Sequence, residues 1–120
     1  MSLFQKQNII LHSGQKSDFK IECDDLTYND VKTLSYLISK RFKFFSVFGV
    51  PSGGLKLAEE LKQYCSNDLG YPVLIVDDVL TTGESMEEFV KKNNVKNPLG
   101  VVIFARGKCP IWITPIFQMW

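Results

Sequence analysis

Two adjacent carboxylates, Asp77 and Asp78, directly follow the apolar run Val73-Leu74-Ile75-Val76. A continuous apolar run is typical of a strand that is covered on both faces, so the two acids come at a buried strand end. Like charges in a low-dielectric site repel each other, and leaving them unpaired there is costly. We therefore expect the pair to serve a metal ion, the hydroxyl groups of a ligand or a helix N-terminus.

The residues after the acid pair supply hydroxyl groups and backbone N–H donors. Thr81, Thr82, Gly83 and Ser85 come where the pattern predicts that a helix begins. A helix N-terminus of this kind favours a phosphate dianion. In this interpretation Glu84 points away from the anion. Carboxylates for sugar hydroxyls beside a phosphate cradle indicate a site for a ribose 5-phosphate.

Two further unusual segments also follow predicted strands. Pro51-Ser52-Gly53-Gly54 closes the strand at 45–50, and Arg106-Gly107-Lys108 follows the strand at 101–105. In an open parallel sheet, ligands bind beyond the carboxyl ends of the strands. The three segments should therefore converge on one site.

Capping and periodicity predict the helices that position these segments. Thr27 as N-cap with Asp30 three residues later indicates a helix start, and the apolar stripe at 31, 34, 38 and 42 gives that helix one buried face. A second helix opens on the glycines, with apolar residues at 55, 58, 61 and 65 on one stripe. Ser85 and Glu88 suggest the cap of a third helix, which Asn93, Asn94 and Pro98 would stop.

Strands that alternate with helices predict an α/β fold, an open and mostly parallel sheet with helices on both faces. We expect residues 1–120 to form a single domain, since a chain of 120 residues has room for one core. In the first 25 residues, Phe19, Ile21 and Cys23 alternate with charged residues and suggest an edge strand or a hairpin.

Composition excludes several classes of protein. The 14 basic and 13 acidic side chains nearly cancel, so we expect no nucleic-acid partner and no anionic membrane surface. No apolar run approaches the ~20 residues of a membrane span, and the first residues lack the pattern of a signal peptide. Three cysteines without CxxC spacing argue against a disulfide framework or a zinc site and for a reducing cytoplasm.

The segment Val73-Leu-Ile-Val-Asp-Asp-Val-Leu-Thr-Thr-Gly-Glu-Ser85 resembles the phosphoribosyl pyrophosphate signature of the type I phosphoribosyltransferases. The resemblance implies that the catalytic residues Asp77 and Asp78 hold the ribose hydroxyls, and that Thr81 to Ser85 hold the 5-phosphate. It also implies Mg²⁺, which Asp77 and Asp78 would hold indirectly, mainly through the substrate. A phospho-acceptor receiver domain is the alternative, but its acids come from different strands and it has no use for the Thr-Thr-Gly-Glu-Ser loop.

Gly49-Val50-Pro51-Ser52-Gly53-Gly54 is similar to the pyrophosphate loop of this family. Its glycines would let the backbone approach a diphosphate, and the dipole of the following helix would favour the negative charge. An ordinary strand-to-helix turn is the other interpretation. The residues expected to bind phosphoribosyl pyrophosphate are Val50, Pro51, Ser52, Gly53, Gly54, Asp77, Asp78, Thr81, Thr82, Gly83, Glu84 and Ser85.

The segment at 11–19 resembles the N-terminal Leu-Lys-Ser-Gly-Arg-x-Ser-Pro-Tyr segment of the orotate phosphoribosyltransferases. The match is partial, because His12, Gln15 and Asp18 replace the lysine, the arginine and the proline. An arginine after the third strand, here Arg106, meets the base carboxylate in the orotate enzymes; a surface ion pair is the alternative. The resemblance implies a pyrimidine base, most specifically orotate, with His12, Lys16, Phe19 and Arg106 as the base-binding residues.

Only residues 55–72 lie between the glycine loop and the signature, where members of the family carry several dozen residues. In orotate enzymes that stretch includes a mobile loop that closes over the pyrophosphate, and this chain has no obvious counterpart. The resemblance therefore implies a minimal orotate-type enzyme that transfers ribose 5-phosphate and releases pyrophosphate. A non-catalytic protein that senses phosphoribosyl pyrophosphate or a nucleotide is the alternative, and the missing loop favours it.

The C-terminal tail at 111–120 is strongly apolar. Pro115 excludes a central strand, so we expect the tail to lie extended along an edge or across a surface. Trp112, Phe117 and Trp120 are residue types that dominate interfaces, which favours a homodimer through the tail. The alternative is that the tail covers the core of its own protomer.

Overall fold

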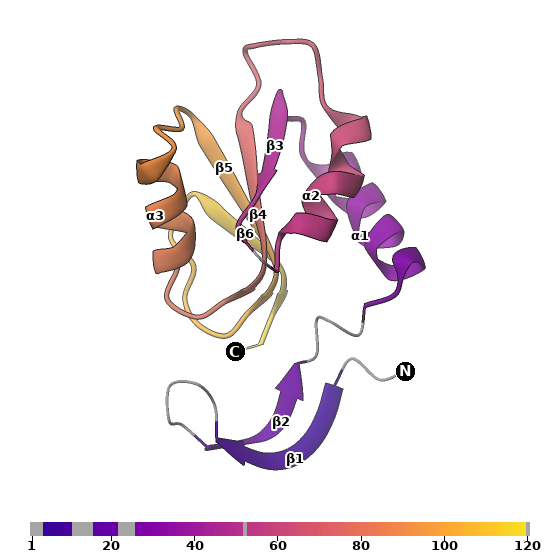
Figure 1. Ribbon diagram of the computed structural model, residues 1–120, viewed down its shortest axis with the longest axis vertical. Coiled ribbons are helices and arrows are strands. Elements are labelled where there is room, and N and C mark those ends of the chain that lie inside the picture. The colour runs from indigo at the N-terminus through magenta and orange to yellow at the C-terminus, as the bar shows by residue number, and fades with distance from the viewer. Residues whose placement is uncertain (1–3, 11–15, 22–25, 52, 120) are drawn as a thin grey trace.

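Four parallel strands form the central sheet of the computed structural model, in the order β3-β4-β5-β6 (Figure 1). The structure describes the backbone of residues 4–10, 16–21, 26–51 and 53–119, and the side chains from residue 26 onward with the same gap at 52. The strands are β3 (Ser46–Gly49), β4 (Val73–Leu80), β5 (Pro98–Ala105) and β6 (Ile113–Gln118). Gly49 pairs with Val76, which in turn pairs with Val101.

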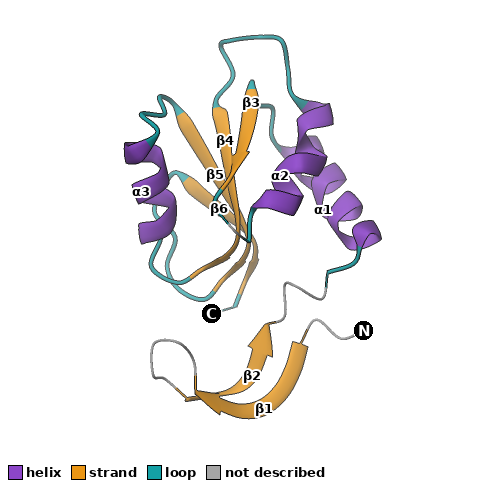
Figure 2. Ribbon diagram, in the orientation of Figure 1, coloured by secondary structure: helices purple, strands orange, loops and turns teal. Residues whose placement is uncertain are grey.

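Three helices cover the two faces of the sheet, as Figure 2 shows. α1 (Tyr28–Arg41) and α2 (Leu55–Leu61), which continues into the 3-10 turn η2 (Lys62–Tyr64), lie on one face, and α3 (Glu84–Lys92) lies on the other. The two cores follow this division. Leu74 and Val76 of β4 pack with Ile38 and Leu61 on the first face, whereas Ile75 packs with Met86 on the second. The structure thus confirms the α/β sheet with helices on both faces.

The start of α1 has the predicted capping box. The backbone N–H of Asp30 donates to Thr27 Oγ1 at 3.1 Å, and the backbone N–H of Thr27 donates to Asp30 Oδ2 at 2.9 Å. These bonds satisfy two N–H groups that a helix start otherwise leaves unpaired. Val31 and Ile38 of the predicted stripe are buried, which fixes α1 against the sheet.

The second helix is shorter and turned differently from the prediction. Ala58 and Leu61 are buried as expected, but Leu55 is half exposed and Leu57 is buried in its place. The helix ends at Leu61 and tightens into η2, so Cys65 lies beyond it. The turn of 3-10 helix breaks the 3.6-residue period on which the predicted stripe depends.

The predicted cap of the third helix is wrong. Gly83, not Ser85, is the N-cap of α3, with φ of 86° and no side-chain hydrogen bond. The chain leaves β4 at Leu80 and reverses through this left-handed glycine, a conformation that a serine would adopt only with strain. After α3, Asn94 and Asn97 take positive φ in the turn before β5.

The C-terminal tail forms β6, an edge strand parallel to β5. The connection at 106–112 contains no helix, and Gly100 lets the end of the connection pack closely against β5: a Cβ there would lie 2.7 Å from Ile113 Cγ1. Ile113 is buried and Trp112 packs against the α3-side core. The described part of the tail is therefore extended along an edge, as predicted, and it covers the core of its own protomer; a homodimer stays a prediction.

The N-terminal segment forms a separate antiparallel hairpin of β1 (Phe4–Ile10) and β2 (Lys16–Ile21). It agrees with the hairpin alternative of the sequence. Figure 1 shows the hairpin beyond the end of the sheet at which the C-terminal end of the chain lies. Within the described ranges, no helix has the length and apolar character needed to span a membrane.

Candidate functional site

The carboxyl ends of β3, β4 and β5 bring the three predicted segments together. The backbone N–H of Val50 donates to the Val76 carbonyl at 2.9 Å, which joins the glycine loop at 49–54 to β4. The backbone N–H of Arg106 donates to the Leu80 carbonyl at 2.9 Å, which joins the connection after β5 to the same strand. The glycine loop and the Arg106 segment thus flank the acid pair, as the parallel sheet requires.

The glycine loop lies directly on the acid pair. A Cβ on Gly53 would lie 2.6 Å from Asp78 Oδ1, so a side chain here would displace the Asp78 carboxylate. Gly54 is equally confined, because its Cβ would lie 2.8 Å from the Val50 backbone nitrogen. The turn is closed by a hydrogen bond of 2.9 Å from the Gly54 N–H to the Val50 carbonyl. The loop thus lies close to Asp78, and its role as a pyrophosphate loop stays a prediction.

Asp77 and Asp78 face different parts of the site. Asp77 is buried and lines a cavity of the loop at 81–85, whereas Asp78 is half-buried and lies against Gly53. Each carboxylate accepts one backbone hydrogen bond: Asp77 Oδ1 from the Asp78 N–H at 2.8 Å, and Asp78 Oδ1 from the Val79 N–H at 2.7 Å. One ligand that spans the site would therefore meet one carboxylate on either side of β4.

Burial raises the pKa of Asp77 to about 7, with a further upward contribution from the Asp78 side chain. The backbone N–H of Asp78 opposes this shift by stabilising the charged form. Without a ligand, Asp77 is accordingly half protonated near neutral pH. Hydroxyl donors or a cation would favour its ionised form and so lower this pKa.

The loop at 81–85 has the features expected of a phosphate cradle. The hydroxyl-bearing residues Thr81, Thr82 and Ser85 are exposed, and Thr82 Oγ1 accepts a hydrogen bond of 3.3 Å from the Glu84 N–H. Glu84 is exposed too. The cavity behind the loop measures about 30 Å³, room for about one water-sized group, so a whole phosphate would lie at its mouth.

The segment after β5 is held by a residue that the sequence did not single out. Gln118 Nε2 donates to the Gly107 carbonyl at 3.1 Å, and Gly107 lies close to the loop, since a Cβ on it would be 2.8 Å from the Thr81 carbonyl oxygen. Nothing in the local sequence around Gln118 indicates this contact, because it depends on how β6 pairs with β5. Gln118 thus supports the connection that carries Arg106.

The predicted base-binding residues are only partly described. Arg106 is half-buried and follows β5, as expected. Lys16 and Phe19 belong to β2, of which the structure describes the backbone. His12, like Ser52 of the glycine loop, lies outside the described residues. Their roles stay predictions.

The acid pair fits a magnesium ion that is bound together with a substrate. Among the described residues, no cluster of three or more acids, histidines or cysteines provides a complete metal site. Mg²⁺ is usually held by one or two carboxylates together with substrate phosphates and water. Asp77 and Asp78 supply that number of carboxylates, so the donor set fits an ion that arrives on a diphosphate.

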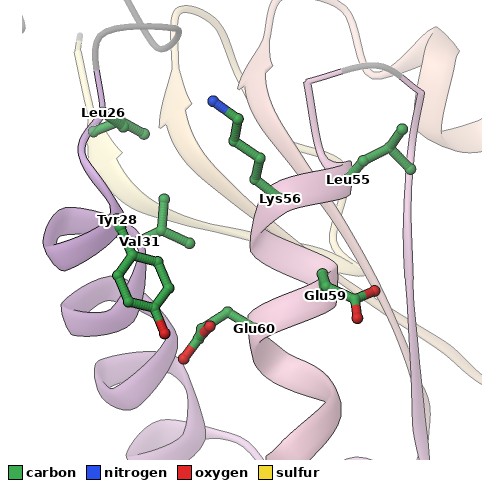
Figure 3. A pocket seen from close by; sticks show the side chains of 7 residues that line it. All are labelled: Leu26, Tyr28, Val31, Leu55, Lys56, Glu59 and Glu60. Carbon is green, nitrogen blue, oxygen red and sulfur yellow. The ribbon is translucent and has the colours of Figure 1, made fainter.

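Two larger grooves lie near the glycine loop. One, of about 550 Å³, adjoins the site: Val50, Pro51 and Ser85 line it together with Phe89 and the last turn of α3. The other, also about 550 Å³, lies between α1 and α2 (Figure 3). Its walls carry Lys56 with Glu59 and Glu60, and no predicted site residue lines it. The predicted residues therefore gather where the loops converge and not in this second groove.

The fold is similar to that of solved phosphoribosyltransferases. The orotate phosphoribosyltransferase from Aeropyrum pernix matches with a TM-score of 0.77 and 18% identity over 98% of this chain and 88% of that one. The UMP synthase of Leishmania donovani matches with 0.73 and 19% identity, over 98% of this chain and 34% of that one. A purine phosphoribosyltransferase from Pyrococcus horikoshii matches with 0.55 and 22% identity over 79% and 84% of the two chains. No protein-family model and no curated protein sequence matches the chain.

Proposed function

From the fold of the type I phosphoribosyltransferases, which this chain has, we propose that it transfers ribose 5-phosphate from phosphoribosyl pyrophosphate to a base and releases pyrophosphate. The observation that carries the proposal is the contact between Gly53 and the Asp78 carboxylate. It brings the glycine loop, which suits a diphosphate, next to Asp77 and Asp78, which suit ribose hydroxyls, and to the loop at 81–85, which suits a phosphate. Diphosphate, ribose and 5-phosphate are the three parts of phosphoribosyl pyrophosphate.

The site would act by binding and alignment. Asp77 and Asp78 accept hydrogen bonds from the ribose hydroxyls, the N–H groups and hydroxyls at 81–85 hold the 5-phosphate, and the backbone at 50–54 holds the diphosphate. The transition state resembles an oxocarbenium ion, so the chain needs no strong nucleophile, and fixing the reactants in line lowers the barrier. Mg²⁺ on the diphosphate, when bound, neutralises part of the charge of the leaving group.

Orotate is the base that we propose. Solved orotate phosphoribosyltransferases are among the most similar folds, and Arg106 lies after β5 next to the phosphate loop. The guanidinium group suits a carboxylate on the base, because two N–H donors can meet both oxygens. Purine enzymes also share the fold, so the choice of base depends on Arg106 and on the partial match at 11–19.

A non-catalytic protein that binds phosphoribosyl pyrophosphate or a nucleotide is the second candidate. The observation that favours it is the segment between the glycine loop and β4, which α2, η2 and a short turn fill. No long loop remains there to close over the diphosphate and exclude water, which is a usual requirement for charge stabilisation in such reactions. Release of pyrophosphate decides between the two candidates.

Binding is tested first, by thermal unfolding with phosphoribosyl pyrophosphate and Mg²⁺. A ligand that binds only the folded chain raises its thermal midpoint. We expect the double substitution Asp77→Asn with Asp78→Asn to abolish most of this rise. Asp68→Asn is the matched control, because Asp68 also accepts a backbone hydrogen bond, from Gly70 at 2.8 Å, but lies in the turn at the other end of the sheet. An equal rise in the double variant would contradict the site.

The base is tested by pyrophosphate release in the presence of orotate, uracil, adenine or hypoxanthine. We expect pyrophosphate to be released with orotate. We expect Arg106→Ala to weaken the binding of orotate by about 2 kcal/mol, the cost of a lost charged hydrogen bond. Equal release with a purine would contradict the choice of base. Binding without release from any base would favour the non-catalytic candidate.

We also propose that the protein resides in a reducing cytoplasm and that it forms a homodimer. Cys65 and Cys109 are free thiols, and burial raises the pKa of both, which keeps them protonated. Thiols of this kind suit a reducing compartment. For the dimer, the support is the exposed part of the tail, where Ile111 is fully exposed and Phe117 is half exposed.

A further inference from the structure

An open pocket of about 410 Å³ lies at the amino ends of β3 and β4, the end of the sheet opposite the candidate site. Phe44, which precedes β3, and Tyr71, which precedes β4, line it together with the end of α1. A hydrogen bond of 2.8 Å from the Ser66 N–H to the Phe44 carbonyl closes one side. A volume of this size lies within the range of small-molecule sites, roughly 300–1,000 Å³.

Aromatic rings and lysines dominate the lining. Tyr36, Tyr64 and Tyr71 contribute three phenol rings, and Lys40 and Lys43 contribute two ammonium groups. The two lysines already lie over rings: Lys40 Nζ is 5.2 Å from the centroid of Tyr36, and Lys43 Nζ is 5.9 Å from that of Tyr71. A flat ring and a negative charge would thus find their partners side by side.

No acidic residue is among the described residues that line this pocket, whereas one lysine and two glutamates line the groove between α1 and α2. The helix dipole explains Lys40, since cations are favourable in the last turn of a helix. It does not explain Lys43, which lies past the end of α1. The pocket therefore holds an excess of positive charge that neither the helix nor an acidic neighbour in its lining accounts for.

We propose that this pocket is a second ligand site, for an anion carried on an aromatic ring, the chemistry of a nucleoside monophosphate. The tyrosine rings would stack on the base, and the lysines would bind the phosphate. A volume of about 410 Å³ suits a single small ligand rather than a run of nucleotides, which favours a free nucleotide over RNA. This site is independent of the proposed reaction, because none of its lining residues belongs to the site at the carboxyl ends of the strands.

The test is a titration of the full chain with uridine 5′-monophosphate, followed through the backbone amide signals by NMR. We expect saturable shifts at Tyr36, Lys43 and Tyr71. The shifts should persist in the double variant Asp77→Asn with Asp78→Asn, which removes the acids of the other site. Lys43→Glu should weaken binding at this pocket about tenfold or more, as the loss of a charged contact to phosphate requires.

Lys32→Glu is the matched control. Both Lys32 and Tyr28 belong to α1, and Lys32 Nζ lies 5.4 Å from the centroid of the Tyr28 ring. Neither residue lines the pocket, so the affinity for uridine 5′-monophosphate should not change. Shifts confined to residues 81–85 and 106–108 would overturn the proposal, as would equal binding of uridine without its phosphate. Tighter binding of a uridine octanucleotide, with shifts that spread beyond the pocket, would overturn it in favour of RNA. Failure to bind phosphoribosyl pyrophosphate would contradict only the proposed function.

Discussion

Asp77 and Asp78 are neighbours in the sequence but have different surroundings in the structure. Asp77 is buried beside the loop at 81–85 and has a pKa raised to about 7, whereas Asp78 lies against the glycine loop. Strand geometry explains the difference, because successive side chains of a strand point to opposite faces. The predicted strand end is wrong, because β4 continues to Leu80 and the two acids lie within it. A single acid there would meet only one of the two loops.

The raised pKa of Asp77 predicts how stability depends on pH. The folded chain keeps a proton on Asp77 up to about pH 7, whereas the unfolded chain loses it near 3.8. The free energy of unfolding should therefore fall as the pH rises through this window, by a few kcal/mol at most. In Asp77→Asn, which carries no titratable group there, this fall should be absent. Urea unfolding of the ligand-free chain between pH 4 and 8 measures it.

Asp68→Asn again provides the control, because it also removes one carboxylate but lies in the turn at the other end of the sheet, away from Asp77. Other carboxylates act in the opposite direction when they ionise more easily in the folded state, so only the difference between wild type and Asp77→Asn is informative. A difference that stays constant across the window would contradict the raised pKa.

At the scale of elements, the loop between β3 and α2 limits what the site tolerates. Gly53→Ala places a methyl group against the Asp78 carboxylate, 2.6 Å from Oδ1, so the carboxylate must leave the Val79 N–H. We expect an affinity for phosphoribosyl pyrophosphate at least about tenfold lower, while the loss of one hydrogen bond lowers stability by only about 1 kcal/mol. The shift of the thermal midpoint against ligand concentration gives the affinity.

Gly70→Ala is the control for this change. It also adds one methyl group in an exposed turn, where the nearest atom is Asp68 Oδ1 at 3.1 Å, remote from the site. Its affinity for the ligand should equal that of wild type. If Gly53→Ala bound as tightly as Gly70→Ala, the glycine loop would not form part of the site.

Local signals in the sequence predicted those elements whose ends are fixed locally. The capping box of Thr27 and Asp30 involves residues three apart, and residues 74–76 of the apolar run are buried on both faces, so both patterns survive in the fold. The cap at Gly83 and the place of Leu55 were missed, because the first depends on a left-handed turn out of β4 and the second on how α2 packs. Likewise, the contact of Gln118 with Gly107 exists only once β6 has paired with β5.

At the scale of the whole molecule, the short segment between the glycine loop and β4 decides the shape of the sheet. α2 and η2 return the chain directly to β4, so β3 remains an edge strand. Phe48 on this edge is half exposed and contacts Phe89 of α3, with ring centroids 6.5 Å apart. The groove that adjoins the site opens beside Phe89. The edge strand β3 and this groove thus lie next to each other at the glycine loop.

The tail itself forms the other edge strand, β6, and this structural role can be tested separately from its proposed role in a dimer. A chain that ends at Pro110 loses buried Ile113 and the hydrogen bond of 2.8 Å from the Gly100 N–H to the Trp112 carbonyl, so it should unfold. Circular dichroism measures the loss of helix and strand on unfolding. A truncated chain that stayed folded with wild-type stability would show that β6 does not complete the core.

Association is tested on the intact chain. Ile111 is fully exposed, and such a side chain at an interface contributes through burial, so Ile111→Glu should shift a dimer towards monomers without unfolding the chain. Leu69→Glu is the control, because Leu69 is 79% exposed in the turn before β4, at the opposite end of the sheet. We expect sedimentation at tens of micromolar to give a dimer for wild type and Leu69→Glu and a monomer for Ile111→Glu. A wild-type monomer would end the dimer proposal, and a dimer in all three chains would place the interface away from the tail.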